Sequence, residues 1–237
     1  MKKHFIELAM AVLMLVCFYI LSWEAAETAG RLIDVSGNIK ADQVILVDAG
    51  HGGVDSGMVG IGGLKEKGIN LDIAMKLKTI LEKKGLAVVM TREEDKGLYE
   101  NGTKNMKAQD LQNRIEQIRK YEPVLSVSIH QNSYEDPEIH GAQVFYYSHS
   151  REGEAVAKIL QESLQEIDPE NHRQAKANET YYLLRRTKVP TVIVECGFLT
   201  NPEEAEKLSG EEYQEQVAEA VAKGIAKCLE YLNEYGN

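Results

Sequence analysis

Three residues of types that can bind metals or transfer protons lie at or just beyond the ends of short apolar runs in this sequence. His51 follows QVILVDAG, His130 ends VLSVSIH and Glu195 ends TVIVE, while a fourth candidate, Glu66, lies in GGLKEKGINLDIA. Two histidines and one glutamate form a ligand set of catalytic zinc, with water completing the shell. A further carboxylate that is not a ligand can act as a base toward that water. These residue types indicate metal-dependent hydrolysis.

The first of these histidines is surrounded by small residues, in the stretch VDAGHGG. Glycines there let the backbone turn sharply after a strand and let a substrate approach the ring closely. A histidine ligand also needs a hydrogen-bond partner that fixes its tautomer. Asp48 and Asp55 are both near enough in the sequence to serve, and their spacing does not choose between them.

Each candidate also has an ordinary structural interpretation. Glu66 lies among lysines and suits a helix start, where an acidic side chain favours the helix dipole, and His130 suits a buried core position. Glu195 follows an apolar run, where a carboxylate is costly unless it is paired or faces a cleft. His140 lies close enough to the same region to be a rival ligand. Cys196 is interpreted as a small buried residue, since no histidine–cysteine signature supports a nucleophile.

These residues need a scaffold, and the hydrophobic periodicity of the chain predicts one. Strands are expected at 43–48, 86–91, 124–130, 142–147 and 191–195, with a short edge strand at 181–185. Helices are expected at 70–84, 108–121, 152–167 and 211–232. The alternation predicts an α/β domain whose mostly parallel sheet is covered by helices on both faces. In such sheets functional residues gather at the carboxyl ends of the strands, where His51, His130 and Glu195 are expected.

The composition limits the classes of function. The chain has 237 residues, 43% of them hydrophobic and 27% charged, and a formal net charge of -10. This length fits one domain once the N-terminal segment is set aside. No block of lysine or arginine stands out, so we expect no nucleic-acid partner. The three cysteines, Cys17, Cys196 and Cys228, include no CxxC pair, which predicts neither a disulfide framework nor a cysteine-based zinc site.

The N-terminal segment predicts export. A basic start precedes an uncharged run of 16 residues from Leu8 to Trp23. As a helix this run would span about 24 Å, less than the roughly 30 Å of a bilayer core, so it is typical of a signal peptide or a short anchor. A buried core helix is the alternative, which the terminal position disfavours. Membrane attachment would use residues 5–23. The expected division has three parts: 1–29 signal peptide or membrane anchor, 30–42 linker and 43–234 catalytic domain.

Six stretches of the chain together resemble the zinc-dependent N-acetylmuramoyl-L-alanine amidases of bacteria, the group called amidase type 3. They occur in the family's order and cover nearly all of residues 43–232: ILVDAGHGGVDSG, GLKEKGINLDIAMKL, MTR, SVSIHQNS, GAQVFYYS and VPTVIVECGFLTNPEEAEKL. The resemblance implies a three-layer α/β/α sandwich around a mixed, mostly parallel six-stranded sheet. It implies Zn²⁺ bound by three ligands and one catalytic carboxylate: His51, Glu66 and His130 as ligands and Glu195 as the carboxylate. The implied reaction is hydrolysis of the amide between N-acetylmuramic acid and L-alanine in peptidoglycan.

Two stretches, LQNRIEQI and AKANETYYLLRRTKVPTVIVECGFLTNP, resemble the spore-germination branch of that family. This implies action on the spore cortex, where removal of the peptide precedes formation of muramic δ-lactam. It also implies targeting by the N-terminal segment or by a protein partner that directs or activates the enzyme. Asn132, two residues after His130, is a candidate for hydrogen bonding to substrate. Arg92 is either structural or a partner for a carboxylate of the stem peptide.

Two other functions share these features. A zinc carboxypeptidase or deacetylase of peptidoglycan would use a similar metal site, and only its products distinguish it from an amidase. A non-catalytic wall-binding module on the same fold is expected to have lost ligands, whereas here all four positions hold His or Glu.

Overall fold

The computed structural model describes residues 43–100 and 102–236. These residues belong to one compact unit, Lys40–Asn237. The expectations for residues 1–29 and 30–42 lie outside the described residues. Within the described residues, every helix is too short or too polar to cross a membrane.

Six strands form one mixed sheet in the order β2-β1-β3-β6-β4-β5. β1, β2, β3 and β6 run parallel to one another, whereas β4 is antiparallel to β6 and β5 is parallel to β4. The strands are β1 (Val44–Ala49), β2 (Ala87–Met90), β3 (Leu125–Asn132), β4 (Gln143–Tyr147), β5 (Lys176–Asn178) and β6 (Thr191–Phe198). The expected α/β class and the mostly parallel six-stranded sheet are confirmed.

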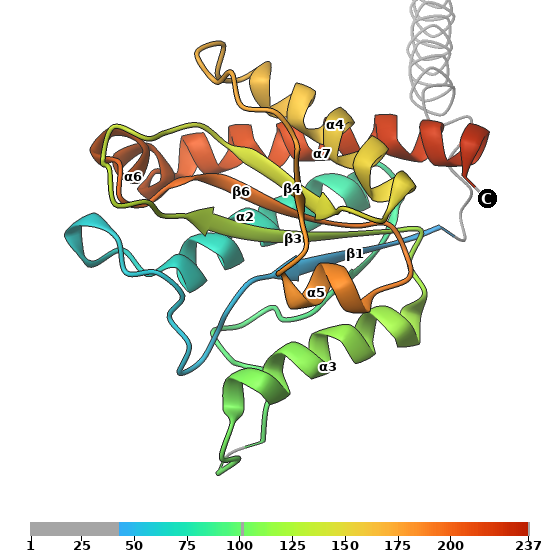
Figure 1. The fold of residues 1–237 in the computed structure, drawn as a ribbon, viewed down its shortest axis with the longest axis horizontal. Coiled ribbons are helices and arrows are strands. Elements are labelled where there is room, and N and C mark those ends of the chain that lie inside the picture. Colours follow the sequence, from blue (N-terminus) through green and yellow to red (C-terminus); the bar gives the residue numbers. More distant parts are fainter. Residues whose placement is uncertain (1–42, 101, 237) are drawn as a thin grey trace, which may run out of the picture. The chain divides into compact units, whose positions relative to one another are not determined.

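Helices cover both faces of this sheet (Figure 1), which completes the expected three layers. On one face α7 (Glu211–Tyr235) packs against both α2 (Glu66–Lys83) and α4 (Arg151–Gln165). On the other face α3 (Met106–Tyr121) packs against the short helix α5 (Tyr182–Arg186) and against β1. Two smaller elements, the 3-10 turn η1 (Ile61–Gly63) and helix α6 (Pro202–Ser209), complete the described chain.

Apolar side chains fill the space between the sheet and both helical layers. Leu46 of β1 packs with Ile115 and Ile118 of α3 and with Leu183 of α5 on one face. On the other face the inward sides of α2 and α7 are buried, at Ile73, Leu77, Val217, Val221 and Ile225. The central strands β3 and β6 are buried along nearly their whole length, as parallel strands covered on both faces are. These two buried strands therefore hold the residues near their ends in fixed positions.

The edge strand expected at residues 181–185 is wrong, because α5 occupies that segment and the edge strand is β5. The Asn178 side chain accepts hydrogen bonds from the backbone N–H groups of Thr180 and Tyr181, which turns the chain out of the strand. Leu183 and Leu184 then pack into two different apolar clusters. A short helix between α3 and the sheet lets both adjacent side chains be buried in this way.

Candidate active site

The carboxyl ends of three neighbouring parallel strands lie at one edge of the sheet. His51 comes two residues after β1, His130 lies near the end of β3, and Glu195 lies in β6. His130 and Glu195 are register partners across the β3–β6 ladder, so the backbone fixes their spacing. Glu66 joins them as the first residue of α2, which starts there and not at residue 70 as expected. The structure therefore brings all four candidates together.

Three of the four form a group that can hold a metal ion. Glu66 Oε1 lies 3.2 Å from His51 Nε2 and 2.9 Å from His130 Nδ1. Among residues 43–100 and 102–236, this is the one group of three or more such ligands whose atoms lie within 4.8 Å of one another. His140, the rival ligand, is exposed and lies outside the group. Two imidazoles and one carboxylate suit Zn²⁺ and leave a coordination position for water.

The charges of this group also suit a dication. Burial lowers the pKa of His51, but the hydrogen bond and charge of Glu66, with a contribution from Asp55, outweigh burial and raise it to about 9. Burial raises the pKa of Glu66, but the His130 and His51 imidazoles outweigh this and hold it well below its ordinary value. The group therefore attracts positive charge strongly. A bound metal ion would take the place of the extra proton on His51.

The backbone of His51 lies in the left-handed region, with φ of 61°, which a residue with a side chain rarely adopts. The guanidinium of Arg114 donates to the His51 carbonyl oxygen at 2.6 Å and so helps to hold this conformation. Two of the nearby glycines make room for the ligands. A β-carbon at Gly50 would collide with the His130 ring, and one at Gly57 would collide with Glu66. The small residues around His51 are thus required by the side chains that converge there.

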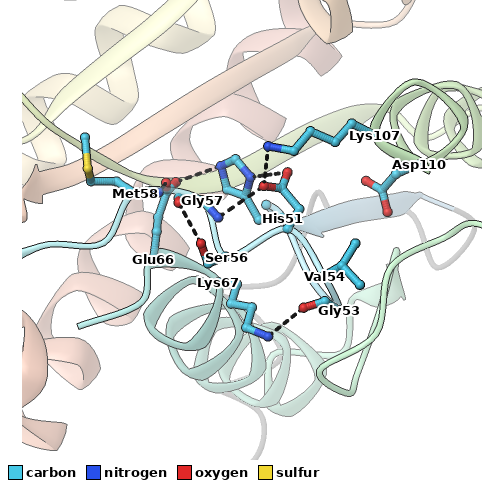
Figure 2. Close-up of polar contacts among 12 residues, drawn as sticks. His51, Gly53, Val54, Ser56, Gly57, Met58, Glu66, Lys67, Lys107 and Asp110 are labelled. Atoms are coloured by element: carbon cyan, nitrogen blue, oxygen red, sulfur yellow. Dashed lines mark hydrogen bonds and ion pairs between the residues drawn. The ribbon is translucent and has the colours of Figure 1, made fainter. Parts of the chain in front are cut away.

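The two aspartates near His51 have different roles. Asp55 Oδ2 lies 2.9 Å from His51 Nδ1. Because a carboxylate only accepts, the contact with Asp55 places a proton on Nδ1, and Nε2, which faces Glu66 Oε1, is the nitrogen that would bind a metal ion. Asp55 Oδ1 is in turn 2.8 Å from the ammonium of Lys107, which extends from α3 toward His51 (Figure 2). Asp55 therefore orients the ring.

Asp48, by contrast, is buried behind the strand end. Its carboxylate pairs with Arg114 and accepts hydrogen bonds from the hydroxyl groups of Thr91 and Ser128. Burial raises the pKa of Asp48, but the charge of Arg114 and the two hydroxyl donors outweigh burial and lower it to about 2. Asp48 therefore joins β1 to α3 and does not touch the His51 ring.

The carboxylate of Glu66 is held in place by the protein itself. The backbone N–H of Met58 donates to Oε2 at 2.8 Å, and that of Gln131 donates to Oε1 at 3.2 Å. The Asn70 side chain, one helical turn further along α2, donates to Oε1 at 3.3 Å. A carboxylate fixed by three donors presents its oxygens to the two histidines with little freedom to rotate.

Glu195 is only 6% exposed, and its carboxylate has few partners. The Tyr181 hydroxyl donates to Oε1 at 3.4 Å, while Oε2 has no hydrogen-bond partner among the described residues. Burial raises the pKa of Glu195 to about 7; the charge of Glu66 adds to this, and His130 opposes it. A buried carboxyl with a free oxygen and a pKa near neutrality is suited to accepting and returning a proton.

A cavity of about 710 Å³ opens over these residues. One wall comes from α3, through Lys107 and Leu111, and another from α5 and the residue before it, through Tyr181 and Tyr182. Asn132 lines the same cavity, as a substrate-contacting residue would. This volume accommodates a drug-sized ligand or a short peptide.

Arg92 does not line this cavity. It is 2% exposed, and its guanidinium donates to four backbone oxygens, those of Ala49, Gly50, Lys67 and Glu94. Of the two roles left open for Arg92, this position agrees with the structural one. Cys196 is buried, as expected, and burial raises the pKa of its thiol well above the usual range. Cys196 and Cys228 are both free thiols.

Sequence reasoning did not single out Lys107, Arg114, Asn70 or Tyr181. The first two lie seven residues apart on α3 and therefore share the face that meets the His51 loop. Their helical spacing was the one signal in the sequence that could have identified them. It is not specific, because charged residues on exposed helix faces have the same spacing.

Comparison with known proteins agrees with this geometry. Residues 45–227 match the family described as N-acetylmuramoyl-L-alanine amidase, amidase type 3. The germination-specific N-acetylmuramoyl-L-alanine amidase of Bacillus subtilis is 40% identical over 198 residues, which is 82% of each chain. The CwlD amidase of Clostridioides difficile, solved in complex with the GerS lipoprotein, is 38% identical with a TM-score of 0.78, over 80% of this chain and 99% of that one.

A third protein, from another organism, extends the comparison. The amidase AmiC2 of Nostoc punctiforme is 33% identical with a TM-score of 0.70, over 80% of this chain and 98% of that one. Residues 45–227, which match the family, contain His51, Glu66, His130 and Glu195. From this match, together with the sheet order and the convergence of His51, Glu66, His130 and Glu195, it follows that the chain belongs to the N-acetylmuramoyl-L-alanine amidase family.

Proposed function

We propose that this peptidoglycan amidase is zinc-dependent and that Glu195 is its catalytic carboxylate. One observation carries the proposal. The buried Glu195, with one oxygen unpartnered, lines the same cavity as His51, Glu66 and His130. A base beside a set of metal ligands in a substrate-sized cavity is what metal-assisted hydrolysis requires.

His51, Glu66 and His130 would hold the zinc ion. When bound, zinc lowers the pKa of a water molecule toward neutrality and polarises the scissile carbonyl group. Hydrogen bonds within the protein already orient two of these side chains. Asp55 keeps the His51 ring turned so that Nε2 is available, and the backbone N–H groups of Met58 and Gln131 hold the Glu66 carboxylate.

Glu195 takes a proton from the attacking water and delivers it to the L-alanine nitrogen as the amide bond breaks. Its pKa, raised by burial to about 7, lets the same side chain accept and release the proton near neutral pH. Tyr181 holds one oxygen and leaves Oε2 for the water. Asn132 offers its side-chain amide to the substrate from the cavity wall.

We further propose that the substrate is spore cortex, in which muramic δ-lactam forms after the peptide is removed. The support is the name of the Bacillus subtilis relative, a germination-specific amidase. The Clostridioides difficile relative was solved with a lipoprotein, which supports a protein partner for this chain as well. Export and membrane attachment through residues 5–23 are proposed from the sequence.

Product analysis tests the proposed function. Zinc-loaded protein is incubated with soluble muropeptides, with cortex fragments and with vegetative wall. An amidase frees L-alanine amino termini and leaves the glycan intact. Release of D-alanine would instead identify a carboxypeptidase, release of acetate a deacetylase, and binding without any product a wall-binding module. Equal or better hydrolysis of vegetative wall would contradict the cortex assignment.

A further inference from the structure

The cavity over the metal-ligand group is acidic. Its described lining holds more acidic than basic side chains: the acidic ones are Asp48, Asp55, Glu66, Asp110 and Glu195, and the basic ones are Lys107 and Arg114. Stem peptides carry carboxylates of their own, and a cationic side chain of the lining that keeps a donor to spare would attract one. Lys107 and Arg114 are the two candidates.

Arg114 cannot serve, because its guanidinium is buried and most of its donors are already used. Its guanidinium is 3% exposed and pairs with both Asp48 and Asp110. It also donates to the carbonyl oxygens of Ala49 and His51. A buried guanidinium with these partners has no accessible donor for a ligand.

Lys107 differs from Arg114 both in exposure and in the number of donors already used. Its side chain is 73% exposed, and its ammonium contacts one oxygen of Asp55 at 2.8 Å. The other oxygen of Asp55 orients the His51 ring, so one carboxylate separates the ammonium from a proposed metal ligand. An ammonium has three donors, which leaves donors for a second acceptor on the open side of the cavity.

The position of Lys107 in α3 also indicates that this side chain serves the cavity. It lies in the first turn of the helix, where a positive charge opposes the helix dipole and lowers helix stability. The helix start is already capped by Asn105, whose side chain accepts from the Ala108 N–H. The position of Lys107 is thus explained by what it faces and not by the needs of its own helix.

We propose that Lys107 binds a free carboxylate of the stem peptide, the one on the residue that follows L-alanine. This inference rests on the proposed function, which places the scissile amide over His51, Glu66 and His130. The second residue of the stem lies roughly 7 Å from that amide in an extended peptide, within the span of a cavity of about 710 Å³ that Lys107 lines. Lys107 then contributes to substrate choice, favouring stems whose second residue carries a free carboxylate over stems in which that group is amidated.

Kinetics on a matched pair of substrates tests this role. Two soluble muropeptides differ only in whether that carboxylate is free or amidated, and both are given to the zinc-loaded full chain. The wild type is expected to favour the free carboxylate. The ratio of the two kcat/KM values should fall by roughly 5- to 10-fold in Lys107→Gln, the effect of one charge-assisted contact. Lys107→Arg should restore most of the ratio.

The exposed Lys104 is the matched control, because it is a nearby lysine that does not line the cavity. Lys104→Gln should leave the ratio unchanged. An unchanged ratio in Lys107→Gln would overturn the inference. So would an equal loss on both substrates with weaker zinc binding, which would show that Lys107 only supports Asp55. If the wild type cleaves neither muropeptide, the proposed function itself fails, and that result is visible before any variant is made.

Discussion

The carboxylate of Asp55 and the ring of His51 form a hydrogen bond of 2.9 Å that determines which imidazole nitrogen faces Glu66. Both residues belong to the loop after β1, so the ligand and its orienting group come from one local segment. The same carboxylate pairs with Lys107 of α3, which ties this loop to a helix on the far side of the cavity. The candidate metal site is thus linked to α3 through Asp55, in addition to the hydrogen bond from Arg114 to the His51 carbonyl oxygen.

Asp55→Ala should weaken zinc binding by about 10- to 100-fold, because the His51 ring loses the acceptor that fixes its tautomer and direction. Competition with a chromogenic chelator measures this affinity. Asp95→Ala is the control, since Asp95 also pairs with a lysine and accepts from this loop at Gly53 but does not touch His51. Equal affinity in the wild type and Asp55→Ala would contradict the orienting role.

His51→Ala and His130→Ala should each lose most of the bound zinc, because each removes one of three protein ligands. His140→Ala should retain it, since His140 is exposed and lies outside the group. Metal analysis after dialysis, with the melting temperature measured on the same samples, checks both statements. Retention of zinc by His51→Ala together with its loss from His140→Ala would relocate the site.

Glu195→Gln should keep zinc and lose amide hydrolysis by at least the roughly 10²- to 10⁴-fold that general acid–base catalysis contributes. Gln has nearly the same shape but cannot take the proton from water. Glu66→Gln should behave differently, with zinc content and activity falling together, because Glu66 is assigned as a ligand. Zinc loss in Glu195→Gln with retention in Glu66→Gln would exchange the two roles.

Asp48→Asn should remove a pH-dependent part of the stability. The pKa of Asp48 is about 2 in the folded protein, below its ordinary value of 3.8. Its ionised form therefore stabilises the fold fully above about pH 4, and this is lost as the pH falls toward 2. The shift corresponds to about 2 kcal/mol of unfolding free energy.

Urea unfolding of the wild type and Asp48→Asn at pH 6 and pH 3 measures this contribution. The difference between the two proteins should be largest at pH 6 and shrink at pH 3. The wild type and Asp48→Asn have the same proposed metal ligands, so the titration of those residues contributes equally to the unfolding free energy of each protein. Asp136→Asn is the control, since Asp136 is exposed. A difference that grows on acidification would contradict the sign of the pKa shift.

The strand ends were predictable, whereas the polar contacts between them mostly were not. Runs such as VLSVSIH and TVIVE mark buried strands whatever the rest of the chain does, so the meeting of His130 and Glu195 followed from the parallel-sheet rule. Arg114 and Asp48 are 66 residues apart, and no local pattern connects them. Asp55 could be named but not separated from Asp48, because only the left-handed backbone at His51 decides which carboxylate reaches the ring.

The error at α5 has a similar origin. Two tyrosines followed by two leucines favour a strand by local propensity. The outcome depends instead on the Asn178 turn and on the two apolar clusters that receive Leu183 and Leu184. Both depend on tertiary packing, which a single sequence does not display.

The register between β3 and β6 matters for redesign of this protein. His130 and Glu195 face each other across a backbone ladder, so the spacing of the proposed ligand and the proposed base is set by the separation of neighbouring strands, about 4.8 Å. The segments that shape the cavity rim lie outside this ladder, in the first turns of α3 with Lys107 and Leu111 and in the turn leading to α5 with Tyr181. An engineer can therefore exchange those rim segments to change which stem peptides are accepted, while the reactive centre keeps its dimensions.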